Sequence, residues 1–508
     1  MSAPVDLLQN AWAFARDFPR DQMPRQYLWD IVDYVPVIID ANLTGRGGWQ
    51  WGSQAMGGDA AAGIVGAFPQ GEKLLVIGTN NQWYEVTQTD PFPVTPVPGG
   101  TALTPKQNPI QGGLNVFAFD GNGAAVPQIL SAPSGTLTIA NMDATAPKAK
   151  YGTYYKDMVV VGGTPGEDNV VRFSVPKSPT VAWDSVSNLG SNRPITGMAA
   201  LRATIIVFHN GSTDRIRGAA PSRSTGEGDM QLEPLFDRVG CGDARSIAYW
   251  QDNCVFADEH GVHITDGAVI RNLADQGGIL YYWRTLYANQ VSVAGNVFLS
   301  YYQVTVRRAD GSNTTLVCDL NKRQWYRFSN CYALSYFASS GTSGVERIYA
   351  GMAGTNRLAR LSPMYFPLTT GNTVVNADAD GKSVLPVFET PWYQMGRMGR
   401  KRARFAYLAY DVRASGAPAD FEGLVAEAPG PRAVTPMLSL GFMNHPFDAA
   451  YTAMGNLPPT THGFTRYKLP INRAPYGIAF KVTQLQPSTV TRIHNLEADI
   501  GPLEPSRL

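Results

Sequence analysis

One pattern recurs along the middle of the chain and limits the possible folds more than any other feature. Between about residues 60 and 363, a short apolar run is followed by a Gly, Asn or Asp turn and then by a second run with aromatic or alternating residues. Each copy is typical of a β-hairpin. Successive copies are 41, 42, 48, 48, 43 and 51 residues apart when measured between Val76, Phe117, Val159, Val207, Val255, Phe298 and Tyr349.

A period of roughly 40–50 residues is that of a four-stranded propeller blade. A hairpin cannot cover both of its faces alone, and stacking blades around an axis buries them. The copies share a pattern rather than letters, and two stacked β-sandwich modules would also produce regularly spaced strands. We therefore expect an all-β fold with a six- or seven-bladed β-propeller over residues 61–363, and we keep the stacked sandwiches as the alternative.

The flanking regions differ from this repeat. Residues 364–384 are polar and rich in turn residues, which is typical of a linker, and residues 385–508 contain alternating strands that predict a C-terminal β-sandwich domain. Residues 1–60 form an N-terminal arm. A short helix is possible over Val5–Phe18, because its apolar residues recur at helical spacing before Pro19.

Charge and cysteine usage exclude several classes of protein. The net charge is +1 and only 16 % of the residues are charged, so there is no large field of one sign for holding DNA or anionic lipid. No apolar stretch reaches the roughly 18 residues of a membrane helix, and the N-terminus has no Sec-type export signal. The four cysteines, Cys241, Cys254, Cys318 and Cys331, contain no CxxC pair. We expect buried, reduced thiols in a protein synthesised in cytoplasm.

Motifs of catalysis and metal binding are weak. The stretch Asn376–Gly381, NADADG, resembles the start of a calcium loop, but its twelfth position is Val387 rather than Glu, so a plain turn is preferred. His260 and His263 are three apart, which places them on opposite sides of a strand and predicts a turn residue and a strand residue rather than a zinc site. The chain carries none of the common catalytic motifs. We therefore expect no catalytic residue, no metal and no cofactor.

Two segments are candidates for contacts with other subunits. The basic run RMGRKRAR contains Arg397, Arg400, Lys401 and Arg402, and it is interpreted as a solvated loop or edge strand, or as a protein contact, in preference to a DNA contact. The loop GRGGWQWGSQAMGG contains Trp49 and Trp51. It could form a subunit interface or equally pack over its own propeller.

Several segments resemble one family in their order along the chain. WDIVDYVPV from Trp29 has an Asp-Tyr-x-Pro core, and GMAALRATIIVFHNGSTDRIRG from Gly197 has a strand, a polar turn and a second strand. In the segment from Arg238, the matching residues are Gly240, Cys241, Ser246, Phe256, Asp258, Gly261, Asp266 and Gly267. With RFAYLAYDV, IAFKVTQL and IHNLEADI near the C-terminus, these segments resemble the β-propeller proteins of phage tails, and in particular the head-to-tail stabilisation or nozzle proteins of short-tailed phages.

This resemblance implies a structural virion protein and not an enzyme. The protein would be synthesised in the bacterial cytoplasm and would form a homo-oligomeric ring, expected to be a hexamer, below the portal and its adaptor ring. Tail fibre or tailspike and tail-tip proteins would be further partners, and DNA would pass through the ring channel without sequence-specific binding. The alternative is a receptor-binding or glycan-hydrolysing tail propeller, for which Trp83, Trp250 and Trp325 are candidate sugar-binding aromatics.

Overall fold

The structure, a computed structural model, covers a chain of 508 residues. It describes all of them apart from residues 1–4, 7–12, 19–22, 24–26, 33, 38–41, 46–49, 52, 57–63, 71–72, 88–91, 100–102, 132–136, 178–182, 219–227, 330–332, 340–346, 353–354, 362–367, 371–372, 376–386, 390–392, 395–400, 415–437, 444–451, 458–464, 474–476, 485–488 and 503–508.

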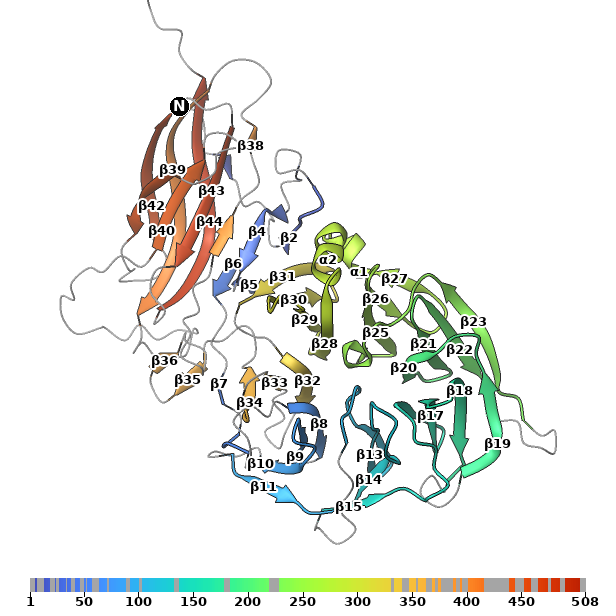
Figure 1. Cartoon of the computed structure of the whole chain (residues 1–508). Coiled ribbons are helices and arrows are strands. Elements are labelled where there is room, and N and C mark those ends of the chain that lie inside the picture. Colours follow the sequence, from blue (N-terminus) through green and yellow to red (C-terminus); the bar gives the residue numbers. More distant parts are fainter. Residues whose placement is uncertain are drawn as a thin grey trace, which may run out of the picture.

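The middle of the chain forms a seven-bladed β-propeller, which confirms the expected fold and fixes the number of blades (Figure 1). Each blade is a four-stranded antiparallel sheet. Blades 1 to 3 are β8 (Ile64–Gln70), β9 (Lys73–Gly78), β10 (Trp83–Thr87) and β11 (Val94–Val97); β12 (Ile110–Gly112), β13 (Asn115–Ala118), β14 (Gln128–Ser131) and β15 (Thr138–Asn141); and β16 (Tyr151–Tyr155), β17 (Met158–Thr164), β18 (Glu167–Ser174) and β19 (Trp183–Gly190). Blades 4 to 6 are β20 (Ile195–Ala200), β21 (Ile205–His209), β22 (Ser212–Arg217) and β23 (Gln231–Asp237); β24 (Ala248–Trp250), β25 (Asn253–Asp258), β26 (Gly261–Thr265) and β27 (Ile270–Asn272); and β28 (Gln290–Phe298), β29 (Tyr301–Arg308), β30 (Asn313–Asp319) and β31 (Gln324–Phe328).

The regular spacing of the apolar runs in the sequence corresponds to the second strand of the blades. This strand packs against neighbouring blades on both faces, so it reads as a continuous apolar run, as in Leu74–Ile77 and Ile205–Phe208, which are all buried. The residues that mark this spacing lie in the second strand in every blade except blade 6, where Phe298 ends the first strand. The long strands of that blade therefore explain the uneven spacing around it.

Blade 7 is completed by the N-terminal part of the chain. Its strands are β32 (Ala333–Ser339), β33 (Arg347–Met352), β34 (Leu358–Leu361) and β7 (Gln50–Trp51). Trp51 is the register partner of Ala359, and the Leu358 N–H donates to Ser53 Oγ at 2.9 Å. Residues from both ends of the propeller sequence thus close the ring of blades.

Blade 6 continues beyond its outer strand into a ten-stranded sheet. The arm strand β4 (Asp30–Val32) pairs in parallel with β31 and antiparallel with β37 (Val387–Glu389). The sheet then runs through β43 (Gly477–Gln484), β40 (Leu438–Met443) and β41 (Thr452–Leu457), and β38 (Tyr393–Gln394) pairs with β43. A single sheet therefore connects the propeller to C-terminal strands.

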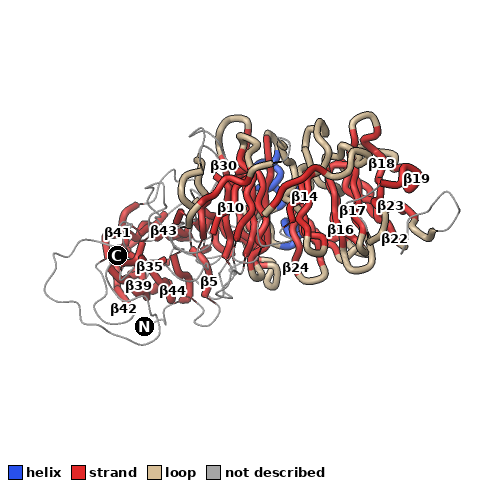
Figure 2. Tube along the Cα trace, turned by 90° about the horizontal axis from the view of Figure 1, so that it is seen from below, coloured by secondary structure: helices blue, strands red, loops and turns tan. Residues whose placement is uncertain are grey.

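A second sheet also mixes the two ends of the chain. Its order is β42 (Thr465–Arg473), β39 (Lys401–Ala414), β44 (Thr489–Pro502), β6 (Asn42–Gly45) and β5 (Tyr34–Val37), and β1 (Val5–Asp6) pairs with β44. Two short pairs complete the strands, β2 (Ala13–Phe14) with β3 (Tyr27–Leu28) and β35 (Leu368–Thr370) with β36 (Thr373–Val375). Seen edge-on, the propeller is a disc with these strands at one side (Figure 2).

The prediction of a helix over Val5–Phe18 is wrong for the residues that the structure describes. They form β1 and β2, because their backbone groups bond to β44 and β3. The described helices lie instead in the connections to blades 5 and 6. They are the 3₁₀ turn η1 (Ala244–Ser246) and the helices α1 (Leu273–Gln276) and α2 (Leu280–Tyr287).

Candidate functional site

The polar contacts of the propeller gather on one of its faces. Strands alternate in direction within a blade, so the connections that lead into the first strands and the turns between second and third strands lie on the same face. Two histidine–aspartate pairs occupy these turns in blades 4 and 5, and a carboxylate–arginine pair lies nearer the axis. This face is where the chain offers polar chemistry.

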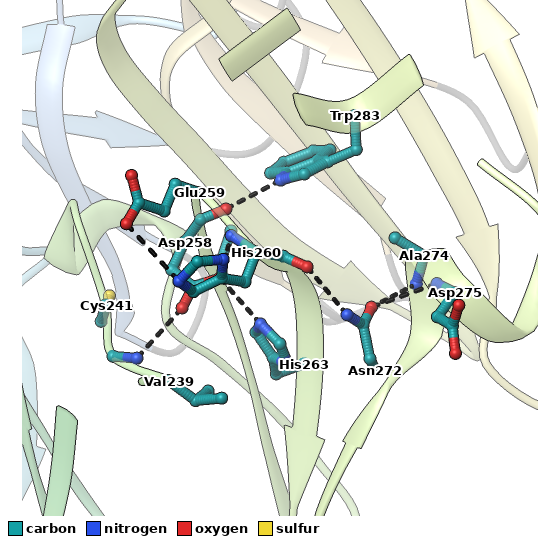
Figure 3. A network of polar contacts seen from close by, with 12 residues as sticks. Val239, Cys241, Asp258, Glu259, His260, His263, Asn272, Ala274, Asp275 and Trp283 are labelled. Atoms are coloured by element: carbon teal, nitrogen blue, oxygen red, sulfur yellow. Dashed lines mark hydrogen bonds and ion pairs between the residues drawn. The ribbon is translucent and has the colours of Figure 1, made fainter. Parts of the chain in front are cut away.

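Asp258 is the centre of the network in blade 5 (Figure 3). One carboxylate oxygen accepts the His260 N–H and His263 Nε2, both at 2.8 Å, and the other accepts the Gly240 N–H at 3.1 Å. Its backbone carbonyl accepts Trp283 Nε1 at 2.7 Å. The side chain is 6 % exposed. Asp258 thus joins β25, β26, α2 and the connection between blades 4 and 5.

The two histidines of HGVH have the different roles that their spacing predicted. His260 lies in the turn with a partly exposed side chain, whereas His263 is buried in β26 and stacks on Phe256 at 5.4 Å between ring centroids. Glu259 and His260 are the whole turn, because Asp258 and Gly261 are register partners. The interpretation as a turn residue and a strand residue is confirmed.

Blade 4 contains a Ser–His–Asp cluster. Ser191 Oγ lies 3.1 Å from His209 Nε2 and donates to Asp214 Oδ2 at 2.9 Å, and the same Nε2 lies 3.1 Å from Asp214 Oδ2. His209 Nδ1 faces the Pro194 carbonyl at 3.0 Å. In a hydrolytic triad the carboxylate orients the ring through one nitrogen while the serine uses the other. In this cluster the serine hydroxyl and the carboxylate both contact the same ring nitrogen, Nε2. The arrangement is therefore a buried polar contact between two blades and not a hydrolytic triad.

The two histidine–aspartate pairs occupy equivalent positions with their order exchanged. His209 and Asp258 end the second strands, and Asp214 and His263 are third in the third strands, five residues later in each case. The Gly240 backbone approaches the His209 carbonyl so closely that a Cβ at Gly240 would clash with it. Two motif residues, Gly240 and Asp258, therefore shape the junction of blades 4 and 5. A five-residue His/Asp spacing at each hairpin is the sequence signal that could have located both pairs.

A second carboxylate, that of Asp243, accepts hydrogen bonds at the inner ends of blades 5 and 6. Asp243 accepts Arg245 Nε at 3.0 Å and Arg245 Nη2 at 2.6 Å, and it also accepts the Val293 N–H of β28 at 3.1 Å. Burial lowers the pKa of Arg245, but the Asp243 charge outweighs it and the net pKa is raised. Burial, with the Asp243 charge, raises the pKa of Tyr151 in blade 3 to about 12. Tyr151, Asp243, Arg245 and Val293 come from three separate parts of the chain, so no local sequence motif predicts that they lie together.

The axis of the propeller is crossed by side chains near this face. Asn108 Nδ2 donates to the Tyr336 carbonyl of blade 7 at 2.9 Å. Gln107 exchanges hydrogen bonds with the backbone of Gly152 in blade 3, including one from the Gly152 N–H at 3.2 Å. One dipeptide thus links the inner strands of two blades that are not neighbours.

The buried thiols predict a loss of stability at alkaline pH. Cys241, Cys254 and Cys318 are buried and free, as expected for reduced thiols, and Cys331 lies outside the described residues. Burial raises the pKa of Cys241 to about 12, whereas an unfolded thiol ionises near about 8.5. Above that pH only the unfolded chain loses the proton, so the free energy of unfolding should fall as pH rises, by up to about 1.4 kcal/mol per pH unit for this thiol. Urea unfolding of Cys241→Ala at a series of pH values should show a shallower fall than wild type, and an identical slope would contradict this assignment.

The structure describes only part of the predicted contact residues. Arg397, Arg400 and Trp49 lie outside the described residues. Lys401 and Arg402 begin β39 and pair with β44 alone, so these two residues of the basic run lie at an edge of the sheet, although later residues of β39 lie between β42 and β44. Pairing with β42 starts only at Ala403, because β42 ends at Arg473. The backbone of Trp51 belongs to blade 7, which favours packing within its own propeller for that residue.

Two of the three aromatics proposed for sugar binding, Trp83 and Trp325, are buried in the propeller. Trp83 donates to Gln128 Oε1 at 2.8 Å and Trp325 to the Leu273 carbonyl at 3.1 Å, and both are buried. Trp250 packs against the core beside blade 6. Within the part of the chain that the structure describes, no group of three His, Cys, Asp or Glu side chains could hold a metal, and the NADADG turn lies outside that part. No described helix is long and apolar enough to cross a membrane.

Comparison with known proteins finds similarity among solved structures, at low sequence identity. No family model and no curated protein matches the sequence. Among solved structures, the RRP9 WD40 repeats are 11 % identical, with a TM-score of 0.41 over 62 % of this chain and 99 % of theirs. The Neurospora crassa Pan2 WD40 domain is 10 % identical, with a TM-score of 0.40 over 65 % of this chain and 98 % of its own. The WD40 propeller domain of Doa1 is also 10 % identical, with a TM-score of 0.38 over 62 % of this chain and 97 % of that domain.

Proposed function

We propose that this chain is a structural protein of a bacteriophage virion that joins the head to the tail. The observation that carries the proposal is the insertion of β4 between β31 and β37, which makes blade 6 and the C-terminal strands one sheet. β4 shares three register pairs with β37 and one, Val32 with Arg327, with β31, and Asp30 also accepts Arg327 Nη2 at 2.7 Å, so pulling these parts from each other would require breaking these contacts. Such a joint suits a protein whose work is mechanical attachment. The ordered sequence segments that resemble head-to-tail stabilisation and nozzle proteins support the same role.

The C-terminal strands are proposed to form a β-sandwich that serves as the attachment domain. Leu408 and Leu496 belong to one of the two sheets, and Phe480 and Val482 belong to the other. All four are fully buried in one apolar cluster. Apolar residues of two sheets that share a core are typical of face-to-face packing at about 10 Å.

The genome would pass between subunits of a ring rather than along the propeller axis. The Gln107–Asn108 dipeptide hydrogen-bonds through its side chains to the inner strands of blades 3 and 7, which are not neighbours, and we infer that it obstructs the axis for a DNA duplex, whose major groove alone is about 12 Å wide. A homo-oligomeric ring, for which we propose six copies, provides a channel of the required size, and the near-neutral net charge of +1 would hold phosphates only weakly.

Imaging the purified chain together with portal and adaptor rings tests the proposal. The expected result is a ring of this chain docked below the adaptor, with the C-terminal strands or the propeller face against it. A chain that stays monomeric and never docks to such rings would overturn the head-to-tail assignment. A glycan array and a hydrolysis screen with the same preparation should both be silent.

The basic run is expected to contribute to this assembly. Arg400→Glu together with Lys401→Glu should weaken binding to the partner rings at least about tenfold, because reversed charges at an interface repel the partner's acidic groups. The thermal midpoint should stay close to that of wild type, since we expect the basic run to be solvated in the free chain and solvated charges contribute little to stability. Lys322→Glu with Arg323→Glu, an adjacent exposed basic pair in blade 6, is the matched control. Unchanged assembly of the first variant in a pull-down would remove the run from the interface.

A further inference from the structure

Two polar side chains at the inner end of blade 6, Ser292 and Arg307, have buried polar atoms without a hydrogen-bond partner among the residues that the structure describes. Ser292 in β28 is 4 % exposed, and its hydroxyl makes no hydrogen bond. Arg307 in β29 is half-buried, and its Nε is buried without a hydrogen bond. A buried hydroxyl or guanidinium donor without a partner costs about 1–3 kcal/mol or more, so two together require an explanation.

The register of blade 6 places these two side chains side by side. Ser292 and Arg307 are direct partners across the antiparallel pair of β28 and β29, so they point to the same face of the blade. Four residues further along β28, Asn296 has the same orientation and donates to the Tyr336 carbonyl at 3.0 Å. The Ser292 hydroxyl and the Arg307 guanidinium therefore face blade 7. Val291, next to Ser292, is 64 % exposed, so solvent reaches this end of the strand.

The charges around Arg307 are already paired. Arg245 pairs with Asp243 at 2.6 Å, and Arg308, the next residue along β29, lies 3.9 Å from Asp310. In the described part of the chain Arg307 makes no ion pair. Burial and the neighbouring Arg245 cation lower the pKa of Arg307, as expected for a cation that lacks an anion. The group thus carries one uncompensated positive charge.

We propose that Ser292 and Arg307 form a binding site for a carboxylate. The guanidinium fork matches the two oxygens of a carboxylate, and the Ser292 hydroxyl supplies a further donor on the same face. One unpaired positive charge matches one negative charge, which favours a carboxylate over a phosphate dianion. The site lies near the mouth of the axis, on the face that carries the Asp243–Arg245 pair.

The experiment is a titration of the full chain with acetate at neutral pH and constant ionic strength, followed by calorimetry and by the thermal midpoint, with inorganic phosphate as the second probe. Wild type should bind acetate, and its midpoint should rise with acetate concentration, because a ligand of the native state stabilises it. Arg307→Gln should raise the midpoint in chloride buffer, since it removes an unpaired cation, and it should abolish the response to acetate. Ser292→Ala should weaken acetate binding about tenfold, the loss of one hydrogen bond to a charged group.

The control is Arg217→Gln, which removes an exposed arginine from blade 4. It should keep the wild-type response to acetate. The proposal is overturned if wild type does not respond to acetate, if Arg307→Gln lowers the midpoint and still responds, or if both arginine variants behave alike. Tighter binding of phosphate than of acetate would overturn the assignment to a carboxylate.

Discussion

Replacing Asp258 by alanine is expected to lower the free energy of unfolding by about 4 kcal/mol, the scale of leaving several buried hydrogen-bond donors without their acceptor. The substitution leaves three donors without an acceptor, namely the Gly240 and His260 N–H groups and His263 Nε2. All of them lie at the junction of blades 4 and 5, where water cannot readily replace the carboxylate because its side chain is 6 % exposed. Urea unfolding followed by intrinsic fluorescence measures the loss.

Glu259→Ala is the matched control for this prediction. Glu259 is the next residue, its side chain is 68 % exposed, and its contact with His260 is 3.5 Å long, so its loss should change stability by less than about 0.5 kcal/mol. Asp258→Asn retains one acceptor oxygen and should give an intermediate loss. Equal stability of Asp258→Ala and Glu259→Ala would show that the network of Figure 3 does not hold the junction.

The blades could be predicted from the sequence because their second strands are buried on both faces. Runs such as Leu74–Ile77 and Ile205–Phe208 need to be continuously apolar, and a local pattern of this kind is visible without knowledge of the partners. The closing strand was not predictable in the same way. β7 contains two residues, Gln50 and Trp51, and it pairs with β34 more than three hundred residues later. Nothing in so short a segment identifies a partner so far away.

The polar sites could be predicted less well than the blades. The spacing of His260 and His263 gave their separate roles, because alternation along a strand is a local rule. The Asp243–Arg245 pair and the Ser292–Arg307 pair depend on which blades adjoin and on strand register, which the letters alone do not determine. The basic run was expected at a sheet edge because it is charged. Lys401 and Arg402 agree with that expectation, because they pair with β44 alone, and β39 pairs on both sides only from Ala403 onwards.

The second large effect is expected at the joint between the arm, blade 6 and the C-terminal strands. Asp30 Oδ2 accepts Arg16 Nη2 at 2.8 Å and Arg327 Nη2 at 2.7 Å, and Oδ1 accepts the Ile31 N–H at 2.9 Å. Asp30→Ala leaves two guanidinium groups facing each other without the anion between them. We expect a loss of about 3 kcal/mol, less than for Asp258, because both arginine side chains are partly exposed and can be rehydrated.

In Asp30→Ala, the loss of stability should first cause local opening at the joint, and global unfolding should follow only under more strongly destabilising conditions. β4 pairs with β31 on one side and β37 on the other, so weakening its anchor should open the ten-stranded sheet at this point while the blades stay folded. Limited proteolysis should therefore cut Asp30→Ala near the arm at a rate well above that of wild type, and hydrogen exchange should rise in β4 and β37 but not in β9 or β21. Asp310→Ala, which removes a 60 % exposed carboxylate 3.9 Å from Arg308, is the control and should leave both measurements unchanged. Uniform exchange across all blades in Asp30→Ala would mean that β4 is part of one cooperative unit with the propeller, and the joint would then have no separate stability.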